Sequence, residues 1–526
     1  MTDTKKPMTR TSSSIITLLC LLMTTLPQTV SADWLGLTPT EQLHICTSVM
    51  EDCPVVPAAA WYFQNEIIAL APVPVDPNTV VRPDWLTNVP EIRLKPTPIW
   101  LASSLQLKNA RLIADGAQLR LATGKRIPLT LTEQIPVNQA FWNQNTTDFF
   151  NNRSLNIRGE ADGKGGFIAR TVWPNDFRLN LSQPLKSLER GESVEQLVRD
   201  ADQSHQSRLI WQRSAGFRSS APEAVIGLML NGAQGDDDEA MAGHFAVVTG
   251  RFMADGSYRH WLVNNFYNLD SYNEKAIIAA PTPMDNYLAD LNSGQNYYRP
   301  SFMLVAVMSD SRLAEAYQFS VNEVFNHFYQ HDFLYNHAAF NCAGVSMDIF
   351  RALGWSIPMR GREGRLKAVA AYFLALVSER SLTEARKAYD YMMTERTRLY
   401  PAQAFDSAAR DLLAILTDPE NRQLSTFEQQ LVNDIEQLWF VSIPQIPSSR
   451  AVGSAPAYDI WEYIERAPAD RNDWQTVESP PRAFPEHLQQ RQPVNASSGL
   501  MPPLTVVLIV LMMLILSVLL YRRYRK

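Results

Sequence analysis

Basic residues are not in excess over acidic ones in this sequence as a whole. Its 526 residues include 48 Lys and Arg against 54 Asp and Glu, which gives a formal net charge of −6. No local run of basic residues with interleaved aromatics is present either, and phosphate backbones are bound by such surfaces. A broadly basic nucleic-acid binder is therefore excluded. With 46% hydrophobic and 19% charged residues, the chain has enough apolar material for two or three cores.

Cysteine is scarce as well, with four in the whole chain. Cys20 lies in an apolar run without the small residues that precede a lipidated cysteine, which argues against lipidation there. Cys46 and Cys53 are close enough in sequence to close a small loop, and export favours a disulfide between them. Cys342 is then left without a partner. Its thiol is either reactive, buried and inert, or paired with another chain.

Long apolar runs without charge occur near the two ends of the chain. Basic residues precede the run Ile15–Leu26, and small residues follow it, so residues 1–32 are predicted to be a cleaved export signal, with an uncleaved anchor as the alternative. The 18 residues at 504–521 carry no charge and would span about 27 Å as a helix, enough to cross a membrane. The tail at 522–526 is basic, which predicts a cytoplasmic tail and a body on the other side.

These ends predict a single-pass protein of the bacterial inner membrane with its body in the periplasm. Four Asn-x-Ser/Thr sequons leave a eukaryotic cell-surface origin open. Between the ends, shifts in composition divide the chain. The predicted organisation is an N-terminal cap region of helix and loops at 33–90, a small all-β domain at 91–200, an α+β domain at 205–358, a helical region at 359–442 and a Pro-rich stalk at 443–503, followed by the membrane helix at 504–521.

Periodicity predicts the elements of the α+β domain and of the helical region. Strands are expected at 223–230, 243–252 and 301–308, with a turn at Asp255-Gly256 that folds a hairpin, and helices at 312–329 and 343–353. In the helical region two Ser-x-x-Glu capping boxes open later helices. The first helix there carries one apolar stripe, made of Leu366, Val369, Ala370, Phe373 and Leu376.

The stretch FNCAGVSMDIFRALGW places Cys342 at the start of a helix that ends at Gly354. Free N–H groups and the positive end of the helix dipole stabilise a thiolate there, so a lowered pKa is predicted for the thiol. The same N–H groups can bind a developing oxyanion. Asn341 is expected to cap the helix, and Gly344 to leave room for a substrate.

A nucleophilic thiol needs a base, and His244 is the best placed of the eight histidines. It stands at the start of an apolar strand after a polar loop, where active-site groups often gather. The hairpin brings the next strand beside it. An asparagine on that strand would hold the imidazole in the correct tautomer. Asn265 or Asn264 is preferred for this role, and His260 stays open because the register is uncertain by a residue or two.

The order "G-H-x-A" on a strand, a hairpin, and then "N-C" opening a helix resembles circularly permuted papain-fold thiol hydrolases. These include permuted NlpC-type peptidases and the lecithin:retinol acyltransferase group, and the resemblance covers about 220–358. It implies a permuted papain-like catalytic domain at 205–358, with Cys342 as the nucleophile and His244 as the base. The residues "AGVS" after Asn-Cys depart from the acyltransferases, so the substrate class is not carried over.

A metal site is the strongest rival to this interpretation. His327 and His331 lie at i, i+4, with His337 and Cys342 downstream, so a structural zinc site is possible on spacing alone. No Glu occupies the place that an HExxH metalloprotease requires. The acidic residues 236–239 lack the ligand spacing of a calcium loop and are better explained as a solvated loop or a lid.

The sequence therefore predicts a membrane-anchored periplasmic cysteine hydrolase that cleaves an amide or ester bond and needs no cofactor. Peptidoglycan or another periplasmic polymer is the expected partner, by analogy alone, and the all-β domain would position the enzyme on it. The alternative is a non-catalytic periplasmic binding or receptor protein with a papain-like body. The oligomeric state is not predicted.

Overall fold

The computed structural model divides the chain into a compact unit at 1–492 and a second at 493–526. The predicted export signal 1–32, membrane helix 504–521 and tail 522–526 lie outside the described residues. Within those residues, no helix is long and apolar enough to cross a membrane. The structure describes residues 44–47, 53, 55–63, 66–71, 80–90, 92–93, 95–103, 105–134, 142–214, 222–234, 242–269 and 278–466, all in the first unit.

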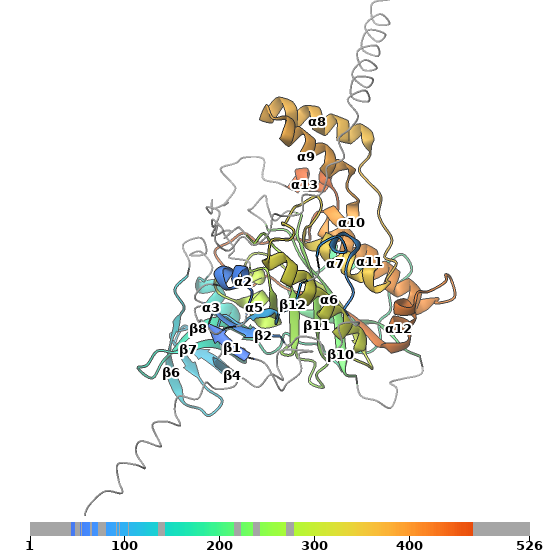
Figure 1. The fold of residues 1–526 in the computed structure, drawn as a ribbon. Helices are drawn as coiled ribbons and strands as arrows, with labels where there is room; N and C mark the ends of the chain where they lie inside the picture. Colours follow the sequence, from blue (N-terminus) through green and yellow to red (C-terminus); the bar gives the residue numbers. More distant parts are fainter. Residues whose placement is uncertain are drawn as a thin grey trace, which may run out of the picture. The chain divides into compact units, whose positions relative to one another are not determined.

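A seven-stranded antiparallel sheet forms the centre of the first unit (Figure 1). Its order is β13-β12-β11-β10-β14-β15-β9. The expected strands and the hairpin around Asp255-Gly256 are confirmed, and the protein has the predicted mixed α+β class. The strands are β9 (Gln206–Gln212), β10 (Ala224–Asn231), β11 (His244–Arg251), β12 (Trp261–Asn264), β13 (Pro281–Pro283), β14 (Ser301–Met308) and β15 (Ile435–Ile443).

Both faces of this sheet are covered, which explains why its central strands are apolar without interruption. Phe245 and Val247 pack with helices α6 (Arg312–Tyr329), α7 (Cys342–Leu353) and α11 (Pro401–Thr417). Their neighbours Ala246 and Val248 point the other way and pack with the β-barrel described next and with α5 (Met284–Ala289). The alternation along β11 therefore separates two cores.

A closed five-stranded barrel precedes the sheet in the chain, and it lies within the predicted all-β domain. Its strands, in spatial order, are β4 (Leu105–Ile113), β5 (Gln118–Arg120), β6 (Arg126–Leu131), β8 (Phe167–Pro174) and β7 (Leu155–Ala161). The barrel is joined tightly to the sheet layer. Arg158 on β7 donates two hydrogen bonds, of 2.6 and 2.9 Å, to the carboxylate of Asp285 on α5.

The N-terminal region differs from the expected helix-and-loop cap. It contains a three-stranded sheet of β1 (His44–Thr47), β2 (Ile67–Leu70) and β3 (Pro98–Trp100), beside helix α2 (Pro57–Tyr62). Strand β3 lies beyond the expected boundary at 90. Strands of three or four residues leave little periodicity to detect, which is why the sequence did not indicate them. A disulfide joins Cys46 to Cys53.

The largest correction concerns β15. The region after 358 is helical as expected, but it ends in β15, which pairs with β14 and β9 inside the central sheet. The α+β domain is therefore not confined to 205–358. The predicted stalk also begins on the body, since Ser454 and Ala233 exchange backbone hydrogen bonds of 2.8 and 3.0 Å. A buried strand that directly follows a helix has neither alternation nor a turn to mark it.

Both predicted capping boxes stand at helix starts, but only the one at Ser425 is complete, with the Glu428 side chain also accepting from the Ser425 N–H. The Ser381 hydroxyl accepts a hydrogen bond from the Glu384 N–H, and Ser425 does the same for Glu428. The other helices are α3 (Gln144–Phe150), α4 (Val194–Arg199), α8 (Arg365–Glu379), α9 (Leu382–Met393), α10 (Arg396–Leu399), α12 (Thr426–Asp434) and α13 (Ile460–Arg466), with the 3-10 helices η3 (Asp84–Leu86) and η6 (Gln295–Tyr297).

His205, just before β9, makes the fold sensitive to acid. Its ring stacks on Phe177 at 4.9 Å, and burial together with the positive charge of Arg153 lowers its pKa to about 4. The unfolded chain takes up this proton near pH 6.5, so stability is complete above that pH and falls as the pH drops towards 4. After discounting partial exposure, we expect a loss on the order of 2 kcal/mol.

Urea unfolding at pH 7 and pH 4.5 measures this effect. The His205→Phe protein should lose less stability than the wild type on acidification, whereas substitution of the exposed His337 by Phe should change nothing. An equal pH dependence for all three proteins would show that His205 is not responsible.

Candidate functional site

The start of α7 is held by a network around its capping residue. The Asn341 side chain accepts a hydrogen bond of 2.7 Å from the Gly344 N–H and donates to the carbonyls of His337 and Arg398, at 2.7 and 2.6 Å. The helix ends at Gly354, whose φ of 108° is left-handed. The predicted cap and stop are therefore confirmed, and Cys342 is the first residue of the helix.

Gly344 serves a different purpose from the one expected. A Cβ at this position would lie 2.8 Å from Cγ of Arg398, so the glycine makes room for that arginine and not for a substrate. Arg398 then donates to both carboxylate oxygens of Asp348, at 2.6 and 2.8 Å, and to the carbonyl of Ala339, at 2.7 Å. These contacts tie α10 to the helix that carries Cys342.

The Cys342 thiol is 5% exposed and is surrounded by hydrogen-bond donors. Its sulfur accepts from the backbone N–H groups of Phe245 and Ala343 and from the Tyr335 hydroxyl. Burial nevertheless raises the pKa of the thiol, because desolvation outweighs these donors and the positive charge of Arg299. The prediction of an acidic thiol at the helix start is therefore wrong for this state of the protein.

His244 begins β11, and Asn265 follows the last residue of β12. The Asn265 side-chain N–H₂ donates to the carbonyl of Ile278 at 2.8 Å, which turns its Oδ1 towards Nε2 of His244. Because Oδ1 can only accept, Nε2 carries the proton and Nδ1 is the basic nitrogen. Burial and the charge of Arg299 lower the pKa of His244 to about 3, so the imidazole is neutral at ordinary pH.

The other two candidates for the orienting residue lie elsewhere. Asn264 points to the helical side of the sheet, where it exchanges hydrogen bonds of 3.1 and 3.2 Å with Gln318 on α6. The carbonyl of His260 accepts a hydrogen bond from the N–H of Arg251, at the far end of β11 from His244. Seven residue steps along a strand are about 23 Å. The structure thus brings Asn265 to His244 and separates Asn264 and His260 from it.

Aromatic side chains connect the base to the thiol. The ring of Tyr267 lies 6.2 Å from the ring of His244 and 5.8 Å from that of Tyr335, whose hydroxyl reaches the Cys342 sulfur. Burial raises the pKa of Tyr335 well above its usual value, so this hydroxyl keeps its proton and remains a donor.

Arg299 is the main residue that the sequence did not single out. It is buried and donates to Oε1 of Gln295 at 2.6 and 3.2 Å and to the carbonyl of Gly232 at 3.3 Å. Its charge contributes to the lowered pKa of His244 and partly opposes the rise in the pKa of Cys342, so one guanidinium acts on both groups. The sequence does contain a signal for Arg299, because this arginine stands just before an apolar strand. His244 is identified by the same kind of signal, a polar residue at the start of an apolar strand.

The structure gives no support to the zinc alternative. Nδ1 of His327 lies 2.5 Å from the carboxylate of Asp332, and Nε2 lies 2.9 Å from the guanidinium of Arg82. Both ring nitrogens are thus engaged with protein groups. Across the described part of the chain, no group of three or more His, Cys, Asp or Glu side chains could hold a metal ion. The acidic loop at 236–239 lies outside the described residues.

The Asn265 contact leads to a test of the third residue. We expect Asn265→Ala to slow acylation of Cys342 about 10²-fold, because the imidazole loses the acceptor that fixes its tautomer. Asn265→Asp should restore part of the rate, since a carboxylate also accepts from Nε2. The buried neighbour Asn264, changed to Ala, is the control and should stay within about threefold of the wild type. A rate for Asn265→Ala that is equal to the control would contradict the assignment.

Searches against protein-family models, curated proteins and solved structures gave no match to this chain. The resemblance to permuted papain-fold hydrolases therefore stays a prediction.

Proposed function

We propose that this protein is a thiol-dependent hydrolase that cleaves an amide or ester bond. The observation that supports this most directly is the buried pair of His244 and Asn265, whose hydrogen bond leaves Nδ1 of His244 free to act as a base. The next residue of the same strand, Phe245, donates its N–H to the Cys342 sulfur. A single charge, on Arg299, acts on both reactive groups. Reactive groups with strongly shifted pKa values are typical of active sites.

The reaction that these residues support proceeds in two halves. The Cys342 sulfur attacks the carbonyl carbon while Nδ1 of His244 takes the thiol proton, and the carbonyl electron pair moves to oxygen. The tetrahedral intermediate then collapses to a thioester, and the leaving amine or alcohol receives the proton from His244. Water attacks the thioester with His244 as base, which releases the acid and returns the proton to sulfur.

The shifted pKa values define the resting state. A raised pKa for Cys342 and a lowered one for His244 keep the thiol and imidazole neutral, so a thiolate forms only as the substrate carbonyl is attacked. The charge of Arg299 favours negative charge on sulfur or on the oxyanion. The N–H of Ala343 and the Tyr335 hydroxyl donate to the sulfur in this structure, and an oxyanion formed next to the sulfur would accept from them.

Location narrows the substrate only by analogy. An export signal at 1–32 and a membrane helix at 504–521 would hold the body at the outer face of the bacterial inner membrane. Cell-wall peptide is the abundant amide there, and we propose it as the substrate class. Burial of Cys342 to 5% exposure also suits the alternative, a binding protein whose thiol never reacts.

An acyl-trapping experiment distinguishes the two functions. The full chain is mixed with p-nitrophenyl acetate and its intact mass is measured. We expect one acetyl group on Cys342, removed by hydroxylamine as a thioester is, formed slowly in His244→Ala and absent in Cys342→Ala. His260→Ala, which alters a buried histidine at the far end of β11, should behave as wild type. If Cys342 were acetylated as fast in His244→Ala as in the wild type, or not acetylated at all, the result would favour the binding protein.

A further inference from the structure

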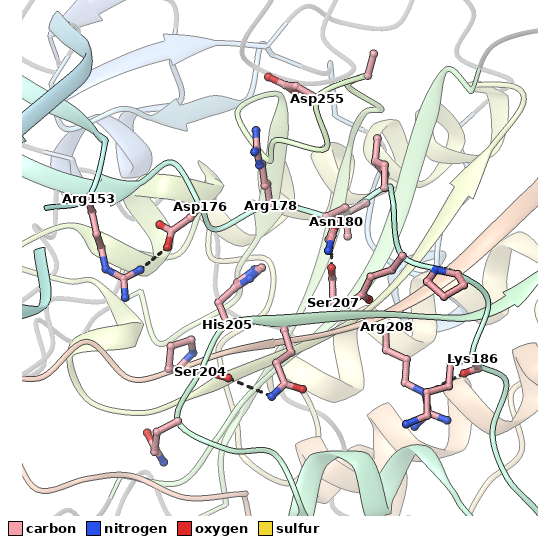
Figure 2. Close-up of a pocket in the computed structure, with 18 of the residues that line it drawn as sticks. Arg153, Asp176, Arg178, Asn180, Lys186, Ser204, His205, Ser207, Arg208 and Asp255 are labelled. Atoms are coloured by element: carbon pink, nitrogen blue, oxygen red, sulfur yellow. Dashed lines mark hydrogen bonds and ion pairs between the residues drawn. The ribbon is translucent and has the colours of Figure 1, made fainter. Parts of the chain in front are cut away.

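A cavity lies between the barrel and the edge of the central sheet, and the proposed reaction does not use it. Its volume is about 1010 Å³. The walls come from the segment after β8, from β9 and the residues before it, and from the hairpin turn after β11. Figure 2 shows Arg153 and Lys186 on opposite sides of the cavity, with His205 between them.

Basic side chains outnumber acidic ones on these walls. Arg153 is paired with Asp176 at 2.6 Å, and Arg208 with Glu192 at 2.6 Å. Arg178 is exposed, and among the described residues no side chain pairs with its guanidinium by a hydrogen bond or an ion pair. A guanidinium left without a carboxylate beside an open cavity is suited to an anionic ligand.

The uncharged lining points to the rest of the ligand. Six of its thirteen residues carry an amide or a hydroxyl group, and each such group offers both donors and acceptors, as sugar hydroxyls require. The volume is at the upper end of the usual range for small-molecule sites, which leaves room for more than one sugar ring. The residues with these groups are Asn180, Gln183, Gln203, Ser204, Gln206 and Ser207.

We propose that this cavity binds an anionic oligosaccharide, with Arg178 and Lys186 contacting its carboxylates and the amides its hydroxyls. Binding here does not depend on the proposed thiol chemistry. The cavity would hold a polymer against the barrel while the body stays fixed beside it, because the Arg158–Asp285 pair fastens the barrel to the sheet layer.

Calorimetric titration of the full chain in detergent tests this site. Trigalacturonate is the probe, and maltotriose is its neutral control. We expect saturable trigalacturonate binding, at least about tenfold weaker maltotriose binding, and a tenfold or greater loss in Arg178→Gln/Lys186→Gln. The variant Arg120→Gln/Lys125→Gln removes two exposed charges from the β5–β6 hairpin and should bind as wild type.

Three outcomes would overturn the proposal. These are no saturable binding of trigalacturonate, an equal loss in both double variants, and citrate binding as tightly as trigalacturonate. The last two would mean that charge alone is recognised. Thermal unfolding of each variant verifies that the fold is retained.

The hairpin formed by α8 and α9 carries apolar side chains that the rest of the body does not cover. Leu366, Leu374 and Val377 are 88%, 73% and 76% exposed. At 100° per residue these three positions fall within about 80° of one another on α8. None of the five residues of the apolar stripe recognised in the sequence is buried. An uncovered apolar face of this kind marks an interaction surface.

Charge and chain connectivity indicate what covers this face. The segment 359–393 has seven basic and four acidic residues, in a chain whose net charge is −6. Lys367 lies 5.6 Å from the ring of Trp461, an exposed residue of α13. From α13 the chain continues to the apolar run at 504–521. The exposed apolar face therefore lies beside the helix from which the chain leads to its predicted membrane segment.

We infer that the α8–α9 hairpin rests in the interface of an anionic lipid bilayer, with its apolar face among the acyl chains and its basic residues at the headgroups. This inference is independent of the thiol chemistry and of the saccharide cavity. It would hold the body close to the membrane surface.

Quenching by lipids measures this directly. The full chain, with Leu374→Cys in a Cys342→Ala background, is labelled with bimane and placed in vesicles containing phosphatidylglycerol and nitroxide lipid. We expect strong quenching at position 374 and little at Lys125→Cys on the barrel. Quenching no greater at 374 than at 125 would overturn the inference, and equal quenching in purely zwitterionic vesicles would overturn its electrostatic part.

Discussion

Replacing Cys342 by serine is expected to reduce acyl transfer at least about 10⁴-fold while the fold is unchanged. A serine hydroxyl is far less acidic than a thiol, and His244, with a pKa of about 3, is too weak a base to activate it. The serine hydroxyl is smaller than the thiol and fits into the same space, where the donors of Phe245, Ala343 and Tyr335 remain available to it. Turnover of p-nitrophenyl acetate and the intact mass of the protein are the measurements.

Combining this change with His244→Ala makes the test sharper. If the two groups act as one unit, the double variant should be no slower than the slower single variant. Rates that multiply would mean that they act independently, which the proposed mechanism does not allow. A Cys342→Ser protein with more than a tenth of the wild-type rate would remove the thiol from the reaction. The thermal midpoint of unfolding should differ little between wild type and Cys342→Ser.

The local parts of this site were predictable because short-range signals define them. Asn341 and Gly354 delimit α7 by capping chemistry, and the turn at Asp255-Gly256 sets the hairpin that joins β11 to β12. His244 and Cys342 could thus be assigned to the ends of their elements. The choice between Asn265 and Asn264 was not predictable, because a shift of one residue reverses the face on which a strand side chain lies.

The remaining features depend on contacts between distant segments. Strand β15 lies more than a hundred residues after β14 and pairs with it, and no local pattern encodes that pairing. Desolvation of Cys342 likewise requires the packing of α7 against β11. The helix start does supply donors to the thiol, as predicted. Burial outweighs them, and burial is a property of the whole fold.

Arg158→Leu is expected to destabilise the protein by about 3–5 kcal/mol, the largest effect on stability that we predict. Arg158 and Asp285 are both buried, and removing the guanidinium leaves a carboxylate without its counter-charge between the barrel and α5. The double variant Arg158→Leu/Asp285→Leu should recover much of this loss, because no charge is then left buried. Urea unfolding of the wild type, the two single variants Arg158→Leu and Asp285→Leu, and the double variant completes the double-mutant cycle.

An exposed pair in the same part of the protein provides the matched control. Asp176 pairs with Arg153 at a similar distance of 2.6 Å, but its side chain is 59% exposed, so Asp176→Ala should cost less than about 1 kcal/mol. If Arg158→Leu cost no more than this control, the barrel would not be fastened to the sheet by the buried pair. The cavity between the barrel and the sheet would then have mobile walls. Ordering these walls on binding would cost entropy and weaken the affinity for a saccharide. A large cost for Arg158→Leu, with recovery in the double variant, means that these walls are set before any ligand binds.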